Sequence, residues 1–377
     1  MLEVAEIIRL HGAAYRAHVG DRLLPSQARV LRDLAACRTA ACGGQLTQCD
    51  HCERQVYRYH SCGNRHCPKC HGHQTERWLD QQRPRLLPSP YYLATFTLPR
   101  ALRALAFAHQ RVVYGVLMRS AAAALQHLAA DPRYVGARLG CLAVLHTWTR
   151  AMRYHPHVHL LVTAGGLSAD GAQWVPPKHP AFLVPVQALS IIFRAKVCAG
   201  LRRAGLLDQV PPAVWTRPWV VHAQHAGRGQ QVLDYLGRYV FRVAISHSRL
   251  EQIADGHVTF RYRDNRTQEE RRVTLTGVEF LGRFLQHVLP RGCAKVRYYG
   301  LWSAARRADL ERARDLLSAP SHRAPAPQPA SEPAPASASV PSPPPPDLPR
   351  CPHCREGTLI LIAVLRPWWR GPPCPVW

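Results

Sequence analysis

The chain has 377 residues, 47% of them hydrophobic, which excludes a disordered chain and allows one main core with smaller modules attached. Lys and Arg number 49 against 24 Asp and Glu, giving a formal net charge of +25, so we expect a polyanionic partner and first of all nucleic acid. The sequence has no apolar run long enough to span a bilayer and no signal-like leader. A membrane partner is therefore disfavoured, and the bacterial cytoplasm, in association with the nucleoid, is expected.

The N-terminal segment combines helical periodicity with crowded cysteines. Apolar residues recur at helical spacing through residues 1–36 and Pro25 interrupts them, which predicts two short helices. Of thirteen cysteines in the chain, seven lie between Cys37 and Cys70. In a cytoplasmic protein such crowding favours metal ligation over disulfide bonds.

Two Cys-x-x-Cys pairs predict a zinc site in this segment. Cys49, Cys52, Cys67 and Cys70 can place four thiolates around one tetrahedral Zn²⁺, with fourteen residues between the pairs. We predict that these four cysteines bind one structural Zn²⁺. The second half of the ligand set stays open, because Cys62, His60 or His66 could replace one of these cysteines. Cys37 and Cys42 are interpreted as small core residues, and the alternative is a second metal that they bind together with His60 or Cys62.

A mixed set of strands and helices follows the cysteine-rich segment. The β-branched and aromatic run at 91–99 predicts a strand, and residues 101–128 have helical periodicity. Two strand-like runs at 140–149 and 157–164 predict an antiparallel hairpin at the centre of a sheet. Further helices are expected at 186–201 and 230–242, and further strands at 257–263 and 271–276.

Two histidines on the second strand of that hairpin suggest a metal site. Because side chains alternate along a strand, His157 and His159 leave the same face, while Val158, Leu160 and Val162 face the core. Two imidazoles are too few for a closed structural site, but they suit an open site in which Mg²⁺ or Mn²⁺ keeps positions free for a substrate phosphate. The alternative is an ordinary pair of surface histidines, since the chain has 21.

A pair of tyrosines follows on the helix expected at 230–242. Tyr235 and Tyr239 are four residues apart, which sets their positions about one turn apart on one face of a helix. An aromatic stripe packed in the core is the alternative interpretation. Arg238 and Arg242 are interleaved at the same spacing and favour contact with phosphate, so we treat them as candidate DNA-binding residues.

The C-terminal part differs in composition from the rest. Residues 318–350 are dominated by Pro, Ala and Ser and predict an extended linker that uncouples the tail. The tail at 351–377 contains one further Cys-x-x-Cys pair, Cys351 and Cys354, with His353 and Cys374 nearby. This pattern resembles half of a zinc ribbon, with metal binding left open.

Several segments, in this order along the chain, resemble the rolling-circle transposases of the insertion-sequence-ninety-one family. They are HSCGNRHCPKC, FTLP, HTWTRAMRYHPHVHLLVTAGGL, YLGRYVFRVAIS, VTFRYRD and FLQHVLPRGCAKVRYYGLW. The similarity runs along most of residues 1–317. The sequence that follows Tyr239 and the Pro-rich tail both differ from the usual pattern of the family.

The resemblance implies an α+β fold. An antiparallel-sheet HUH endonuclease domain with flanking helices is expected at 88–317, preceded at 1–85 by a small helical and zinc-binding domain that recognises DNA. The resemblance also implies that His157 and His159 hold the catalytic metal, and that Tyr235 and Tyr239 attack single-stranded or hairpin DNA at the ends of the element. His146 and Gln224 are the candidates for a third metal ligand.

Two other functions compete with a transposase. A plasmid-type replication initiator or relaxase would use the same nicking chemistry for replication or transfer, although the zinc segment argues against it. A non-catalytic zinc DNA-binding remnant of a transposase would bind DNA without cutting it. An activity test separates the second from an active enzyme.

Overall fold

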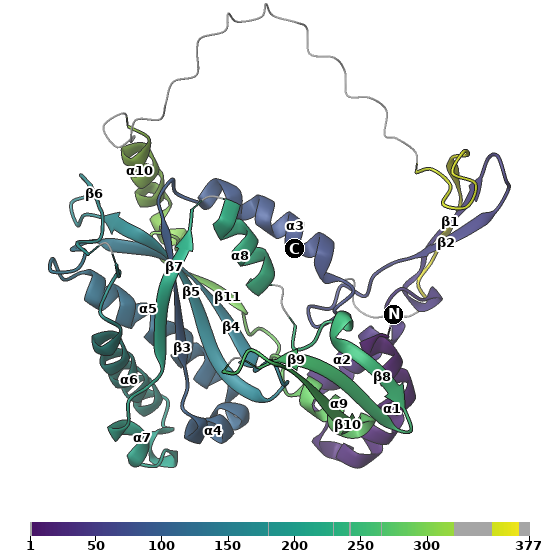
Figure 1. Ribbon diagram of the computed structural model, residues 1–377, viewed down its shortest axis with the longest axis horizontal. Helices are drawn as coiled ribbons and strands as arrows, with labels where there is room; N and C mark the ends of the chain where they lie inside the picture. The colour runs from purple at the N-terminus through teal and green to yellow at the C-terminus, as the bar shows by residue number, and fades with distance from the viewer. Residues whose placement is uncertain are drawn as a thin grey trace, which may run out of the picture.

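The computed structural model describes residues 2–179, 181–228, 230–240, 243–264, 266–319 and 349–368. It has the expected α+β architecture, with an antiparallel sheet, helices on both sides of it, and a cysteine-rich region near the N-terminus (Figure 1). No helix among these residues is long and apolar enough to cross a membrane.

The largest sheet is antiparallel throughout. Its strands follow the order β11-β4-β5-β3-β7, and the short β6 also pairs with β5. The predicted strand at 91–99 and the predicted hairpin are both found, the latter as the central pair β4 and β5. The strands are β3 (Tyr91–Thr97), β4 (Arg138–Trp148), β5 (Tyr154–Leu167), β6 (Trp174–Val175), β7 (Val221–Gly227) and β11 (Val296–Gly300).

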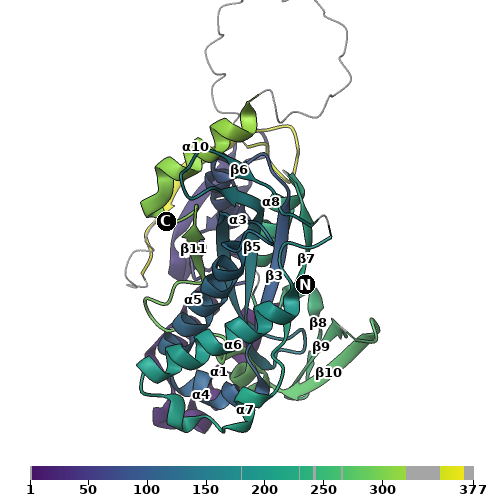
Figure 2. The same ribbon diagram turned by 90° about the vertical axis from the view of Figure 1, so that its left-hand side faces the viewer.

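Both faces of this sheet are covered, and the alternation along β5 determines which residues face which layer. Val158, Leu160 and Val162 pack in a core with α5 and α6, whereas Leu161 packs with α8 and α10 on the opposite face. Figures 1 and 2 show α5 and α6 on one side of the sheet and α3 and α8 on the other. These helices are α3 (His71–Gln82), α5 (Gln110–Ala129), α6 (Val186–Arg203), α8 (Gln230–Val240) and α10 (Arg307–Ser318).

The helix expected over 101–128 is interrupted. His109 has φ −119° and ψ 44°, outside the helical region, so the chain forms the short α4 (Arg103–Ala108) and then α5. This break lets α4 lie across the end of the sheet near the start of β5, which it contacts. A further short helix, α7 (Ala213–Thr216), precedes β7.

A second hydrophobic core combines residues of the N-terminal region with residues from the later segment 244–288. Helices α1 (Val4–Val19) and α2 (Pro25–Ala36), which match the two predicted N-terminal helices, pack against α9 (Gly277–Leu285) and a small sheet of order β10-β9-β8. Those strands are β8 (Leu250–Ala254), β9 (His257–Arg263) and β10 (Glu270–Thr276). Residues on both sides of the expected boundary near residue 88 therefore contribute to one core.

The tail after residue 348 does not lie apart from the rest of the protein, although the sequence predicted that it would. Strand β12 (Leu359–Leu365) pairs antiparallel with β1 (Gly44–Cys49), which in turn pairs with β2 (Gln55–Tyr59). The tail segment 349–368 is therefore not an uncoupled appendage, because it supplies the third strand of an N-terminal ribbon that projects from the body (Figure 1).

Candidate active site and cysteine clusters

Three histidines meet on one face of the central sheet. His157 and His159 leave β5 on the face of Leu161, and His146 of β4 is the register partner of His157. One ring nitrogen from each of the three lies within 4.8 Å of the others. Gln224, the other candidate for a third ligand, pairs with Leu93 and lies two strands away from β5. The structure therefore favours His146 as the third member.

Hydrogen bonds orient two of these imidazoles. The Nδ1–H of His157 donates to the carbonyl oxygen of His155 at 2.7 Å, which leaves the Nε2 lone pair of His157 free. Nδ1 of His159 is bonded to the hydroxyl of Thr95 at 3.0 Å, across the β3–β5 pairing. Bonds of this kind fix ring orientation at metal sites and leave the other nitrogen for the metal.

A group of cationic side chains borders the histidines. The guanidinium of Arg103 donates to Nδ1 of His155 at 2.6 Å. Burial lowers the pKa of Arg103, and the nearby charges of Arg100 and Arg153 lower it further. Burial, with His157 and Arg103 nearby, lowers the pKa of His155 to about 4. His155 is therefore neutral at pH 7, and the net positive charge of the arginines suits a phosphate.

On its other side, the histidine cluster packs against the aromatic side chain of Trp148. The ring of His146 stacks on Trp148 with 4.7 Å between centroids, and Nζ of Lys295 lies 5.3 Å from the centre of the Trp148 ring. Burial, together with the charge of Arg65, lowers the pKa of Lys295 to about 7. A small cavity beside Trp148 is also lined by Val243 and Ala244.

Helix α8 lies over the same face of the sheet as the histidines. Val232, Leu236 and Val240 recur every four residues and are buried in the core that contains Leu161. On another side of α8, Gly237 approaches the side chains of α3 so closely that an added Cβ would lie 3.1 Å from Leu79.

The predicted tyrosines belong to this helix. Tyr235 and Tyr239 lie within α8, as does Arg238, but their side chains fall outside the described part of the chain, and so does the whole of Arg242. Since the helix ends at Val240 and Val243 lines the cavity beside Trp148, the C-terminal end of α8 lies next to the histidine-bearing end of the sheet.

Four cysteines gather where α2 meets the start of α3. The Sγ atoms of Cys37, Cys62, Cys67 and Cys70 lie within 4.8 Å of one another. The separations of Cys70 from Cys37 and from Cys62 are 3.5 and 3.6 Å. In a tetrahedron with zinc–sulfur bonds of about 2.3 Å the sulfurs lie about 3.8 Å apart, so this cluster fits one Zn²⁺.

The four-cysteine set chosen from the sequence requires correction. Cys67 and Cys70 belong to the cluster just described, but Cys49 and Cys52 lie in a separate cluster with Cys351 and Cys354. The two Cys-x-x-Cys pairs are neighbours in the sequence, but β1 and β2 carry Cys49 and Cys52 away from α2 and toward the tail. Of the residues considered for an alternative or second metal site, Cys37 and Cys62 belong to the first cluster, whereas Cys42, His60 and His66 belong to neither.

Similarity to known proteins identifies the chain. A family model described as "Transposase zinc-binding domain" matches residues 7–98, and one described as "Putative transposase" matches residues 140–309. "Putative transposase y4qJ" of Sinorhizobium fredii is 40% identical over 383 residues, covering 96% of this chain and 95% of that protein. The chain belongs to the insertion-sequence-ninety-one family of transposases.

Two further similarities accompany this membership. The "Transposase for insertion sequence element IS801" of Pseudomonas savastanoi pv. phaseolicola is 31% identical over 286 residues, covering 71% of this transposase and 68% of the relative. A solved structure of the conjugative relaxase TrwC in complex with oriT DNA, in its metal-bound form, is weakly similar. It has a TM-score of 0.26 and 21% identity, and the match covers 30% of this chain and 44% of that chain.

Membership and cysteine geometry together support structural zinc in this transposase. The zinc-binding family model spans all four residues of the cluster at Cys37, Cys62, Cys67 and Cys70. As a transposase the protein acts on DNA, which agrees with the excess of basic residues.

Proposed function

We propose that this transposase nicks and rejoins single-stranded DNA at the ends of its element through a 5′-phosphotyrosine, in a rolling-circle mode of transposition. The observation that carries the proposal is the gathering of His146, His157 and His159 on the sheet face covered by α8, the helix to which Tyr235 and Tyr239 belong. Such chemistry requires a divalent metal that contacts the scissile phosphate and a nucleophile that can reach the same phosphorus atom.

The three imidazoles fit an open metal site. They supply three nitrogen donors and leave positions for a phosphate, and a hydrogen bond at Nδ1 orients the ring of His157 and that of His159. Mg²⁺ or Mn²⁺ bound there would polarise the scissile phosphate and stabilise its developing charge. Because imidazole is a better ligand for Mn²⁺ than for Mg²⁺, Mn²⁺ is expected to support nicking at lower concentration.

In this proposal the tyrosines are the nucleophiles that cleave the strand. A phenol with a pKa near 10 is a weak nucleophile at pH 7, so it depends on activation of the phosphate it attacks. The tyrosine Oη forms a bond to phosphorus, the bond from phosphorus to the 3′ oxygen breaks, and the 3′ oxygen leaves as a hydroxyl while the phenol loses its proton. The 5′ end stays on the protein.

Rejoining reverses these bonds with a different strand. A free 3′ hydroxyl attacks the phosphotyrosine, the phosphorus–tyrosine bond breaks, and the phenol regains its proton. The energy of the phosphodiester is conserved in the intermediate, which agrees with the lack of a P-loop motif in the sequence. Two tyrosines one turn apart would allow one to hold a strand while the other cleaves.

Basic residues near the histidines would guide the DNA backbone. Arg103 is fixed by its bond to His155, with Arg100 and Arg153 close by. Arg238 and Arg242 are proposed to contact phosphates near the tyrosines. A single strand, or the unpaired part of a hairpin, is the proposed substrate because the tyrosine must reach one backbone.

A gel assay for covalent attachment tests this function. The wild-type protein is incubated with a single-stranded oligonucleotide carrying the element end, with Mn²⁺, with Mg²⁺, or with EDTA. We expect an SDS-resistant protein–DNA complex with either metal and none with EDTA or with the Tyr235→Phe/Tyr239→Phe double variant. If the double variant still forms the complex, the nucleophile lies elsewhere, and if a folded wild-type protein binds but never forms it, the chain is a non-catalytic DNA-binding protein.

A further inference from the structure

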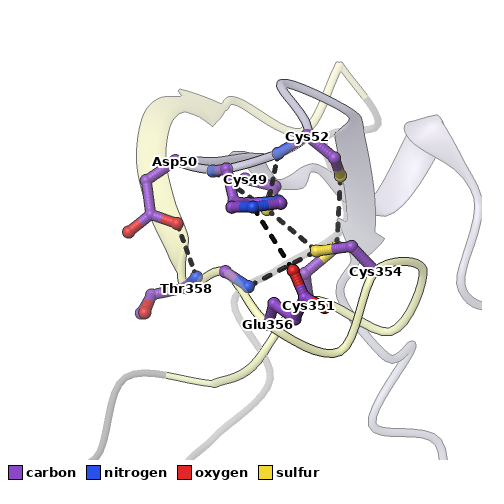
Figure 3. A network of polar contacts seen from close by, with 9 residues as sticks. Cys49, Asp50, Cys52, Cys351, Cys354, Glu356 and Thr358 are labelled. Atoms are coloured by element: carbon purple, nitrogen blue, oxygen red, sulfur yellow. Dashed lines mark hydrogen bonds and ion pairs between the residues drawn. The ribbon is translucent and has the colours of Figure 1, made fainter.

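The two ends of the chain share a second cluster of four thiols. Cys49 ends β1 and Cys52 follows it, Cys351 and Cys354 precede β12, and all four Sγ atoms lie within 4.8 Å of one another (Figure 3). This group is separate from the cluster that contains Cys37, and its two tail cysteines lie outside the segment that matches the zinc-binding family model.

The sulfur spacing fits a metal ion rather than disulfide bonds. Sγ of Cys49 lies 3.6 Å from Sγ of Cys354, and Sγ of Cys52 lies 3.8 Å from Sγ of Cys351. The edges of a zinc–thiolate tetrahedron are about 3.8 Å, whereas a disulfide requires about 2 Å. All four residues are free cysteines.

The two Cys-x-x-Cys turns have the same local geometry. In each turn the residue after the second cysteine has a positive φ, 56° at Glu53 and 63° at Arg355. The amide of His51 donates to Sγ of Cys49 at 3.4 Å, and the amide of His353 donates to Sγ of Cys351 at the same distance. Amide donors favour the charged thiolate over the neutral thiol, and the thiolate is the form that binds a metal.

Polar contacts hold the turns in register. The amide of Asp50 donates to the carbonyl of Thr358 at 3.1 Å, and the amide of Thr358 donates to Oδ1 of Asp50 at 2.7 Å. Gly357 is packed against the cluster, since an added Cβ would come within 2.4 Å of Sγ of Cys49. The tail therefore fits this site closely, and a residue larger than glycine at 357 would displace it.

The local core is too small to hold the tail without help. Besides the cysteines, the buried or partly buried apolar residues of this cluster are Leu359 and Val56. The ion pair between His51 and Glu356 is exposed and contributes little. A segment with so little apolar burial commonly draws its folding free energy from a bound metal.

We propose that a second structural zinc ion, bound by Cys49, Cys52, Cys351 and Cys354, fastens the C-terminal tail to the N-terminal ribbon. This zinc clasp joins residues about 300 positions apart in the chain, so the ribbon of β1 and β2 gains its third strand only when the C-terminus is present. Since α10 is anchored on the catalytic sheet, both ends of the connection across 320–348 are fixed.

Metal content tests the clasp in the full-length protein. The Cys351→Ser/Cys354→Ser variant should hold one zinc ion fewer per chain than the wild type. So should Cys49→Ser/Cys52→Ser, and combining the two pairs should cause no further loss. Cys198→Ser is the matched control, because Cys198 is a half-buried thiol outside both clusters. Equal zinc content in the tail variant and the control would overturn the proposal.

Cleavage of the connection tests the clasp without changing a cysteine. A recognition site for a specific protease is inserted between Ala336 and Ser337, and the cut protein is passed through a sizing column. The tail should elute with the body, and EDTA should release it. Release without EDTA, or retention despite removal of zinc, would overturn the proposal. Neither readout depends on nicking, so the clasp and the proposed phosphotyrosine chemistry can fail independently.

Discussion

Single hydrogen bonds orient the histidines of the proposed metal site. The bond from His157 to a carbonyl oxygen and the bond between His159 and Thr95 each engage Nδ1 of the ring. The sequence suggested His157 and His159 from their spacing on a strand, and the family resemblance implied their role as metal ligands. It could not predict Thr95, because the contact depends on which residue of β3 lies opposite His159, and register is set by pairing rather than by local pattern.

Thr95 is predicted to be a positioning residue. Thr95→Val keeps the shape but removes the hydroxyl bonded to His159, so the Mn²⁺ concentration for half-maximal nicking should rise about 10- to 100-fold. Thr95→Ser keeps the hydroxyl and is expected to behave nearly as wild type. Titration of Mn²⁺ in the nicking assay measures both, and equal metal dependence of the two variants would show that the bond does not support the site.

At the scale of elements, local periodicity predicted most of the catalytic sheet. Runs of β-branched, aromatic and other apolar residues predicted β3, β4 and β5, and helical spacing predicted α6 and α8. The same reasoning failed for the cysteines and for the tail. Cys49 pairs with Cys354 across about 300 residues, and no pattern along the chain encodes that contact. One available signal was the recurrence of Cys-x-His-Cys in CDHCER and CPHCRE.

The packing of α8 on the sheet is predicted to hold the nucleophile helix in place. Leu236 is 1% exposed in the core below α8, so Leu236→Ala should lower the free energy of unfolding by about 2–5 kcal/mol. Leu10→Ala removes the same atoms from a side chain that is 60% exposed and should change the free energy of unfolding by less than about 0.5 kcal/mol. Denaturant unfolding gives both values, and a loss below 1 kcal/mol for Leu236→Ala would show that α8 does not depend on this contact.

For the whole molecule, the proposed function assigns DNA binding and DNA cleavage to different parts. Binding is expected to follow from the net charge of +25, whereas cleavage is proposed to depend on three histidines and the helix above them. The two properties should therefore be separable by a local change.

His157→Ala is predicted to separate them. Loss of one metal ligand should slow nicking by about 1,000-fold or more, since several kcal/mol of transition-state stabilisation are lost. The affinity for the oligonucleotide should stay within about twofold of the wild type, because the basic surface is unchanged. The solvent-exposed His127→Ala is the control and should alter neither property. A parallel loss of binding and nicking would indicate a general defect in His157→Ala instead.

The central claim is that DNA becomes attached to a tyrosine of α8, and mapping the attached peptide tests it most directly. Trypsin cuts after Arg228, Arg238 and Arg242, so Tyr235 and Tyr239 fall in different peptides, 229–238 and 239–242. After covalent capture and nuclease trimming, mass spectrometry should find the remaining nucleotide on one or both of these peptides and on no other. A nucleotide on any peptide outside residues 229–242 would contradict the assignment of Tyr235 and Tyr239 as the nucleophiles.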